Sequence, residues 1–122
     1  MAKKILTRNL NSLSEAEYFS KIRSALRKAF QYWKPGVEAL KLASRPYQGT
    51  SKLAKTQYQC AKCNDWFLKK DVAIDHIIPC GSLKNYEDIV PFIERLTTEN
   101  VSDFQILCKP CHQVKTNLEK KS

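Results

Sequence analysis

Two cysteine pairs of the form Cys-x-x-Cys constrain the fold of this chain more than any other feature. Cys60 and Cys63 form the first pair, and Cys108 and Cys111 form the second. Two residues between cysteines let both sulfurs turn toward one ion, and two such knuckles supply the four ligands of a tetrahedral zinc site. We therefore predict one structural Zn²⁺ held by all four cysteines, with no open position for catalysis. The alternative is two unrelated pairs, one of them redox-active.

The 44 residues between the two pairs exceed what a minimal zinc ribbon needs, so they must form a structural excursion of their own. A chain of 122 residues suffices for one domain with a helical extension, but not for a large cofactor-binding fold. Its apolar runs are too short for a secretory signal or a membrane helix, so we expect a reducing, cytoplasmic location and no membrane partner. Cys80, the fifth cysteine, is expected to be a small buried side chain.

Positive charge is concentrated in the N-terminal half of the chain. The formal net charge is +9, and residues 1–59 carry all of it, with 12 Lys or Arg against three Glu. Residues 60–122 carry nine side chains of each sign. This asymmetry favours a polyanion partner such as DNA over a basic surface that serves only solubility. An adaptor that binds an acidic protein is a further alternative.

Local signals predict helices in both halves. Ser14 and Glu17 match a capping box, and apolar residues at helical spacing follow as far as Trp33, so a helix is expected from Glu15 until Pro35-Gly36 ends it. Its basic side chains Arg23, Arg27 and Lys28 are the candidate DNA-binding residues. The other expected elements are a helix over 37–43, a polar linker over 44–57, strands over 58–62 and 71–78, one or two helices over 85–96, an apolar run over 104–107, and a last helix from Pro110 to about Leu118.

The only two histidines of the chain lie beside chemically useful neighbours. His76 follows Asp75, and His112 follows the second knuckle directly. Imidazole can accept a proton from water near neutral pH, and a carboxylate with a second imidazole can hold a divalent ion that keeps open positions for phosphate and water. In an ideal strand Asp75 and His76 point to opposite faces, so both serve one site only if the strand ends there.

The last helix is expected to present two different faces. Cys111, Val114 and Leu118 form one stripe, which we predict to face zinc and core. His112 is turned about 100° away, with Lys115 and Glu119 on its side. One helix could thus contribute to a zinc site and to a second metal site.

Three segments of the chain resemble the HNH nuclease family, of the ββα-metal type with an added four-cysteine zinc site. They are 58–63 (Tyr-Gln-Cys-Ala-Lys-Cys), 72–79 (Val-Ala-Ile-Asp-His-Ile-Ile-Pro) and 104–116 (Phe-Gln-Ile-Leu-Cys-Lys-Pro-Cys-His-Gln-Val-Lys-Thr). The chain looks most like the small HNH endonucleases encoded by bacteriophages. The resemblance covers roughly residues 57–117, and it is the combination of the motifs that makes it specific.

The resemblance implies an α+β fold. A ββα-metal core stapled by the zinc site would occupy residues 57–122, and a basic helical DNA-binding extension with its linker would occupy residues 1–56. A phage-type protein of this kind would act in the cytoplasm of the bacterial host. Its partners would be DNA and phage packaging or terminase proteins.

The resemblance also implies a mechanism. His76 would be the general base, while Asp75 and His112 would bind a catalytic Mg²⁺ or Mn²⁺. DNA would be nicked or cut to leave 5′-phosphate and 3′-hydroxyl ends. Lys115, on the same side of the last helix as His112, joins the candidate DNA-binding residues.

The middle motif departs from the family pattern. The family often has Asn five residues before the second knuckle, where this chain has Asp103, and the nearest Asn is Asn100. Either residue could brace the loop that holds the base. The rival function is a non-catalytic zinc-knuckle protein that binds nucleic acid, or a phage assembly protein, neither of which needs a divalent-ion site.

Overall fold

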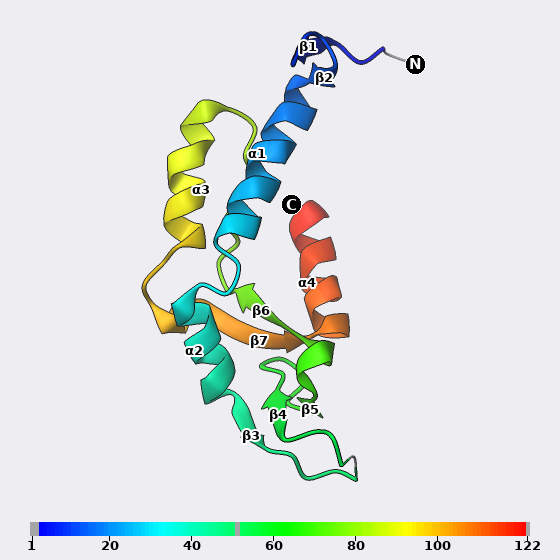
Figure 1. Ribbon diagram of the computed structural model, residues 1–122, viewed down its shortest axis with the longest axis vertical. Helices are drawn as coiled ribbons and strands as arrows, with labels where there is room; N and C mark the ends of the chain where they lie inside the picture. Colours follow the sequence, from blue (N-terminus) through cyan, green and yellow to red (C-terminus); the bar gives the residue numbers. More distant parts are fainter. Residues whose placement is uncertain (1–2, 51, 122) are drawn as a thin grey trace. The chain divides into compact units, whose positions relative to one another are not determined.

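The computed structural model describes residues 3–50 and 52–121, which form a mixed α/β fold of short helices and small sheets (Figure 1). Contacts divide the chain into two compact units. One combines the N-terminal segment through Gln31 with Cys80–Thr97, and the other combines Tyr32–Pro79 with the segment that begins at Thr98. The boundary predicted between residues 56 and 57 therefore lies inside the second unit. Among the described residues, no helix is long and apolar enough to cross a membrane.

The first unit is built on the helix α1 (Glu15–Ala29), which follows the short paired strands β1 (Leu6–Arg8) and β2 (Leu13–Ser14). The predicted capping box is confirmed, since Ser14 Oγ accepts from the backbone N–H of Glu17 at 3.2 Å and Glu17 Oε1 accepts from that of Ser14 at 3.1 Å. The helix ends earlier than predicted, because the chain leaves the helical path and Tyr32 adopts a positive φ of 63°.

The core of the first unit joins α1 to α3 (Ile89–Leu96). A 3₁₀ turn at Tyr86–Asp88 precedes α3, so the helical segment over 85–96 divides before Pro91, which lies in the first turn of α3. A proline is tolerated there because its missing N–H has no intrahelical acceptor. The buried members of this core are Phe19, Cys80, Leu83, Phe92 and Leu96. Cys80 is only 2% exposed, which confirms the expectation for the fifth cysteine.

The second unit contains an antiparallel strand pair with helices attached. β6 (Val72–His76) pairs with β7 (Phe104–Cys108), and α4 (Lys109–Lys121) begins directly after β7. The helix α2 (Lys34–Leu42) packs against both strands. Pro35, which was predicted to end the preceding helix, lies in the first turn of α2 and so helps to begin it.

A second, three-stranded sheet leads into the first cysteine pair. It has the order β3 (Ser44–Pro46), β4 (Thr56–Gln59) and β5 (Trp66–Phe67), all antiparallel. The prediction of a linker over 44–57 is wrong at both ends of that segment, because the backbone there pairs as β3 with β4. The pairing is long-range in sequence, so composition alone gave no sign of it.

Gly36 lies where α2 approaches the strand pair closely. A Cβ atom built there would lie 3.1 Å from Ile74 Cγ2 and 3.3 Å from Phe104 Cδ1. We expect Gly36→Val to destabilise the protein by about 1–3 kcal/mol, because overpacking pushes the helix away from the strands. Urea denaturation measures the effect, with Lys41→Val on the exposed side of α2 as the control. Equal midpoints for the two variants would contradict close packing at this position.

Candidate metal centre and the Asp75 cluster

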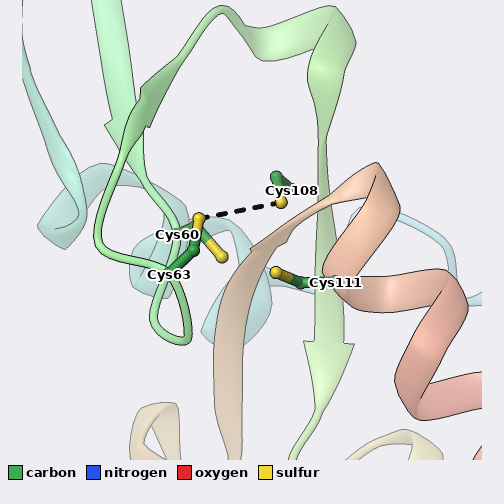
Figure 2. Close-up of side chains that lie close together, drawn as sticks. All are labelled: Cys60, Cys63, Cys108 and Cys111. Atoms are coloured by element: carbon green, nitrogen blue, oxygen red, sulfur yellow. Dashed lines mark hydrogen bonds between the residues drawn. The ribbon is translucent and has the colours of Figure 1, made fainter.

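Four cysteine sulfurs from two distant parts of the chain converge (Figure 2). Cys60 and Cys63 come from the turn between β4 and β5, while Cys108 ends β7 and Cys111 lies in the first turn of α4. All four sulfurs lie within 4.8 Å of one another, and those of Cys63 and Cys108 are 3.9 Å apart. Tetrahedral zinc with bonds of about 2.3 Å needs sulfurs about 3.8 Å apart. The cluster can therefore hold a metal ion such as zinc.

Backbone hydrogen bonds shape the first knuckle. The N–H of Cys60 donates to Asp65 O and that of Asn64 to Cys60 O, both at 3.0 Å. Asn64 completes the turn with a φ of 64°, a conformation that Asn tolerates better than most residues. The N–H of Ala61 donates to Ile106 O in β7 at 2.7 Å. The two halves of the cluster are thus connected through the backbone as well as through the sulfurs.

The four thiols do not ionise alike. Burial raises the pKa of the Cys60 thiol, but backbone N–H groups of Cys108, Cys63 and Lys62 donate to its sulfur and bring the pKa to about 6. The hydrogen bond between Cys111 and Cys108, burial, and the neighbouring Cys60 sulfur raise the pKa of Cys111 to about 12. A divalent cation stabilises thiolates that would otherwise repel one another. The four cysteine sulfurs are therefore suitable ligands for such an ion.

A second group of polar side chains surrounds Asp75. This carboxylate is only 8% exposed. Gln105 Nε2 of the facing strand donates to Asp75 Oδ2 at 2.9 Å, and Lys115 Nζ lies 3.0 Å from the same oxygen. His112 Nε2 lies 3.5 Å from Asp75 Oδ1. The structure therefore brings together Asp75 and His112, the two predicted ligands of the catalytic ion, and it shows that Gln105 and Lys115 contact the same carboxylate.

Lys115 connects the Asp75 cluster to the end of β6. Its ammonium group is 2.7 Å from Glu119 Oε1 and donates to His76 O at 2.8 Å. Burial lowers the pKa of Lys115, but the hydrogen bonds to Glu119 and Asp75 outweigh it and raise the pKa above its ordinary value. The ammonium is therefore charged at neutral pH and balances the buried carboxylate.

His76 lies at the end of β6, and its imidazole packs against Phe104 and not against the Asp75 cluster. The ring centroid is 4.7 Å from that of Phe104, the residue directly opposite in β7. Directly opposite residues share one face of a strand pair, and the next pair along points to the other face. The Asp75–Gln105 pair and the His76–Phe104 pair therefore occupy opposite faces. β6 does end at His76, but the side chains of Asp75 and His76 still point to opposite faces.

Of the two faces predicted for the last helix, the structure confirms one and contradicts the other. His112, Lys115 and Glu119 do lie together beside Asp75. The stripe of Cys111, Val114 and Leu118 does not face the core, since Val114 is 51% and Leu118 is 60% exposed. Of the three, Cys111 alone packs against the buried cluster of Cys60, Leu107 and Cys108, although α4 contacts both strands of the pair.

In the middle motif, Asp103 forms a hydrogen bond with Ile77, the residue that follows His76. Its backbone O accepts from the N–H of Ile77 at 2.9 Å, and its Oδ2 accepts from Thr98 Oγ1 at 2.5 Å. Asn100 is exposed, and its O accepts from the N–H of Asp103 at 3.1 Å. The hydrogen bond from the residue after His76 to this segment is thus accepted by the backbone of Asp103 and not by the side chain of Asp103 or Asn100.

The candidate DNA-binding residues of α1 lie partly against the core of the first unit. Arg27 and Lys28 are exposed, whereas Arg23 is half-buried. The guanidinium groups of Arg23 and Arg27 each lie 5.7 Å from the ring centroid of Phe92. Burial and the nearby charge of Arg27 lower the pKa of Arg23. The guanidinium groups of Arg23 and Arg27 repel each other, and binding of an anion such as a phosphate would reduce this repulsion.

Gln105 is the member of the cluster that sequence reasoning missed. Its role depends on the register that places it opposite Asp75, and no motif in the sequence encodes that register. Comparison of the chain with known protein families, with curated proteins and with solved structures found no match.

Proposed function

We propose that this chain is a metal-dependent HNH endonuclease, of the kind encoded by bacteriophages, that nicks or cuts DNA by hydrolysing phosphodiester bonds. The observation that carries the proposal is the buried Asp75 carboxylate facing His112, one residue after the last cysteine of the cluster. Two antiparallel strands followed directly by a helix supply this pair, an arrangement that a ββα-metal core requires. The four cysteines would hold a structural Zn²⁺ that fixes the start of α4.

Asp75 and His112 would hold the catalytic Mg²⁺ or Mn²⁺. A divalent ion there would neutralise charge on the phosphate and lower the pKa of a bound water. Lys115 now occupies one side of the carboxylate, 3.0 Å from Oδ2, so an incoming ion competes with it. Glu119 gives the ammonium a second carboxylate at 2.7 Å, which would retain it near the site.

His76 would accept the proton of the attacking water. Lys115 fixes its backbone through the carbonyl, and Phe104 orients its ring. Because the ring lies on the face opposite Asp75, the base must act at the open end of the strand pair, where β6 stops. The basic side chains of α1 and Lys115 would bind the DNA backbone.

A non-catalytic nucleic-acid-binding protein is the second candidate, and one observation favours it. Lys115 and Gln105 already satisfy Asp75 with 3.0 and 2.9 Å contacts, as a purely structural ion pair would. A binding module with four cysteines needs nothing more from this cluster. A test of metal dependence separates the two candidates.

We expect the wild-type protein to nick supercoiled plasmid only when Mg²⁺ or Mn²⁺ is added. His112→Ala should raise the metal concentration for half-maximal nicking by at least about tenfold, because removing a ligand weakens the ion's binding. Gln113→Ala, the exposed next residue on α4, is the matched control. Zinc content is measured in all three proteins, since His112 adjoins Cys111. No nicking by wild type with any divalent ion would favour the binding module.

A further inference from the structure

Positive charge also extends through the middle of the chain, beyond α1 and the Asp75 cluster. Residues 41–70 have a net charge of +6, with Asp65 as their only acidic residue. All of them belong to the second unit, and the six lysines in this stretch are exposed. The basic residues are Lys41, Arg45, Lys52, Lys55, Lys62, Lys69 and Lys70. Lys41 lies in α2, and the others lie in the three-stranded sheet, its connecting loops and the 3₁₀ turn that follows β5.

The register of this sheet places distinct side chains on its two faces. Tyr58 is opposite Phe67, and Phe67 packs against the buried cluster of Cys60, Leu107 and Cys108, so this face points inward. The other face carries the pairs Arg45–Gln57 and Gln59–Trp66. An arginine, two amides and a tryptophan thus form the outward face of the sheet.

Arg45 and Trp66 form a stacked pair on that outward face. The guanidinium carbon lies 3.8 Å from the centroid of the Trp66 ring, and Arg45 Nε donates to Gln57 Oε1 at 3.2 Å. Both described partners of Arg45 are uncharged, and no carboxylate of residues 3–50 and 52–119 forms an ion pair with it. A guanidinium stacked on a ring keeps N–H groups free at its edge, and two of them can donate hydrogen bonds to one phosphate.

From these observations we infer that the outward face of the β3–β4–β5 sheet is a second DNA-binding surface. Arg45 and the exposed lysines of residues 41–70 would contact phosphates, and Trp66 would stack on an unpaired base. Stacking of bases on aromatic rings beside a basic groove is the common way in which proteins hold single-stranded nucleic acid. The inference rests on the proposed function only for the choice of DNA as the polyanion.

The cysteine cluster adjoins this surface through the turn between β4 and β5. β4 ends one residue before Cys60, and the hydrogen bond from Cys60 N to Asp65 O closes the turn that leads to Trp66. Metal bound by the four cysteines would therefore hold β4 and β5 in register. The same unit carries the Asp75 cluster, so one metal ion would organise both the binding face and the proposed catalytic residues.

Trp66 can report on its own contact with DNA. The chain has two tryptophans, and Trp33→Phe leaves Trp66 as the sole emitter. In that background, titration with a fluorescent-labelled single-stranded oligonucleotide, without added divalent ions so that nothing is cut, gives both anisotropy and tryptophan quenching. We expect DNA to quench Trp66, and Arg45→Gln to weaken binding about tenfold. Trp66→Leu should weaken binding roughly 5- to 100-fold, and Trp66→Phe should restore part of the loss.

Salt dependence separates the two basic surfaces. Replacing Lys52, Lys55, Lys69 and Lys70 by Ala should make the slope of log affinity against log salt shallower, by about 0.7 for each phosphate of a single strand that is no longer neutralised. The comparison is Arg23→Ala, Arg27→Ala and Lys28→Ala combined in α1, which should leave the quenching of Trp66 in place. Zinc content and far-ultraviolet circular dichroism are checked in every variant.

Unquenched Trp66 on saturation with DNA, or an unchanged affinity and slope in the Arg45 and lysine variants, would overturn the inference. So would a chain that binds no DNA. A plasmid-nicking assay distinguishes failure of the proposed nuclease activity from failure of the proposed DNA-binding surface. A chain that binds through this face but never nicks contradicts the nuclease and retains the surface. A chain that nicks while these variants bind like the wild type contradicts the surface and retains the nuclease.

Discussion

Replacing Cys108 by Ser is expected to abolish metal binding and to unfold the second unit. Cys108 is 3% exposed and joins β7 to α4, and its sulfur lies 3.9 Å from Cys63 of the other knuckle. Structural zinc contributes about 10–16 kcal/mol in small zinc-finger peptides, which is comparable with the total stability of a domain, about 5–15 kcal/mol. Metal analysis of the purified protein and urea denaturation measure the two losses.

Cys80→Ala is the matched control, because Cys80 lies in the core of the first unit among Phe19 and Phe92. It should keep one zinc per chain and lower the free energy of unfolding by only about 1 kcal/mol, the usual cost of a small core substitution. Reduced, well-folded wild-type protein that contains no zinc would contradict the role proposed for the cluster.

The sequence predicted well those features that neighbouring residues determine. The capping box of Ser14 and Glu17 involves four consecutive residues, and it starts α1 where expected. The convergence of the cysteines followed from the spacing within each pair, because tetrahedral coordination leaves few other uses for two knuckles. In these cases a few residues that lie close together in the sequence supply the groups that determine the structure.

The features that depend on distant contacts were not predictable in the same way. The segment over 44–57 is polar and was expected to be a linker, yet pairing of Arg45 with Gln57 makes its ends strands. The helix α1 packs with Cys80–Thr97, and α2 packs with the strand pair, so the two basic helices belong to different units. Hydrophobic periodicity shows which face of a helix is apolar, but it does not show which element covers that face.

The Asp75 cluster illustrates both cases. The resemblance to HNH nucleases suggested Asp75 and His112 as partners, and the structure places them 3.5 Å apart. The ion pair of Lys115 with the same carboxylate could not be foreseen, because it depends on how α4 is rotated against β6. The same rotation leaves Val114 and Leu118 exposed, contrary to the stripe predicted from helical spacing.

Removal of the His76 imidazole is expected to have the largest effect on catalysis. His76→Ala should lower the rate of plasmid nicking by roughly 10²–10⁴-fold at saturating Mg²⁺ or Mn²⁺, the usual cost of losing a general base. The metal concentration for half-maximal nicking should stay unchanged, because His76 is not proposed as a ligand. This separates it from His112→Ala, which should change the metal requirement first.

Packing of His76 on Phe104, with ring centroids 4.7 Å apart, requires a second variant. His76→Gln fills more of the same space but accepts no proton at neutral pH, so it should be as inactive as His76→Ala while its urea midpoint stays closer to the wild type. Both variants should keep their zinc and their DNA affinity. Undiminished nicking by His76→Gln would mean that another group activates the water, and loss of zinc in both variants would mean that His76 acts by supporting the fold around β6 and β7.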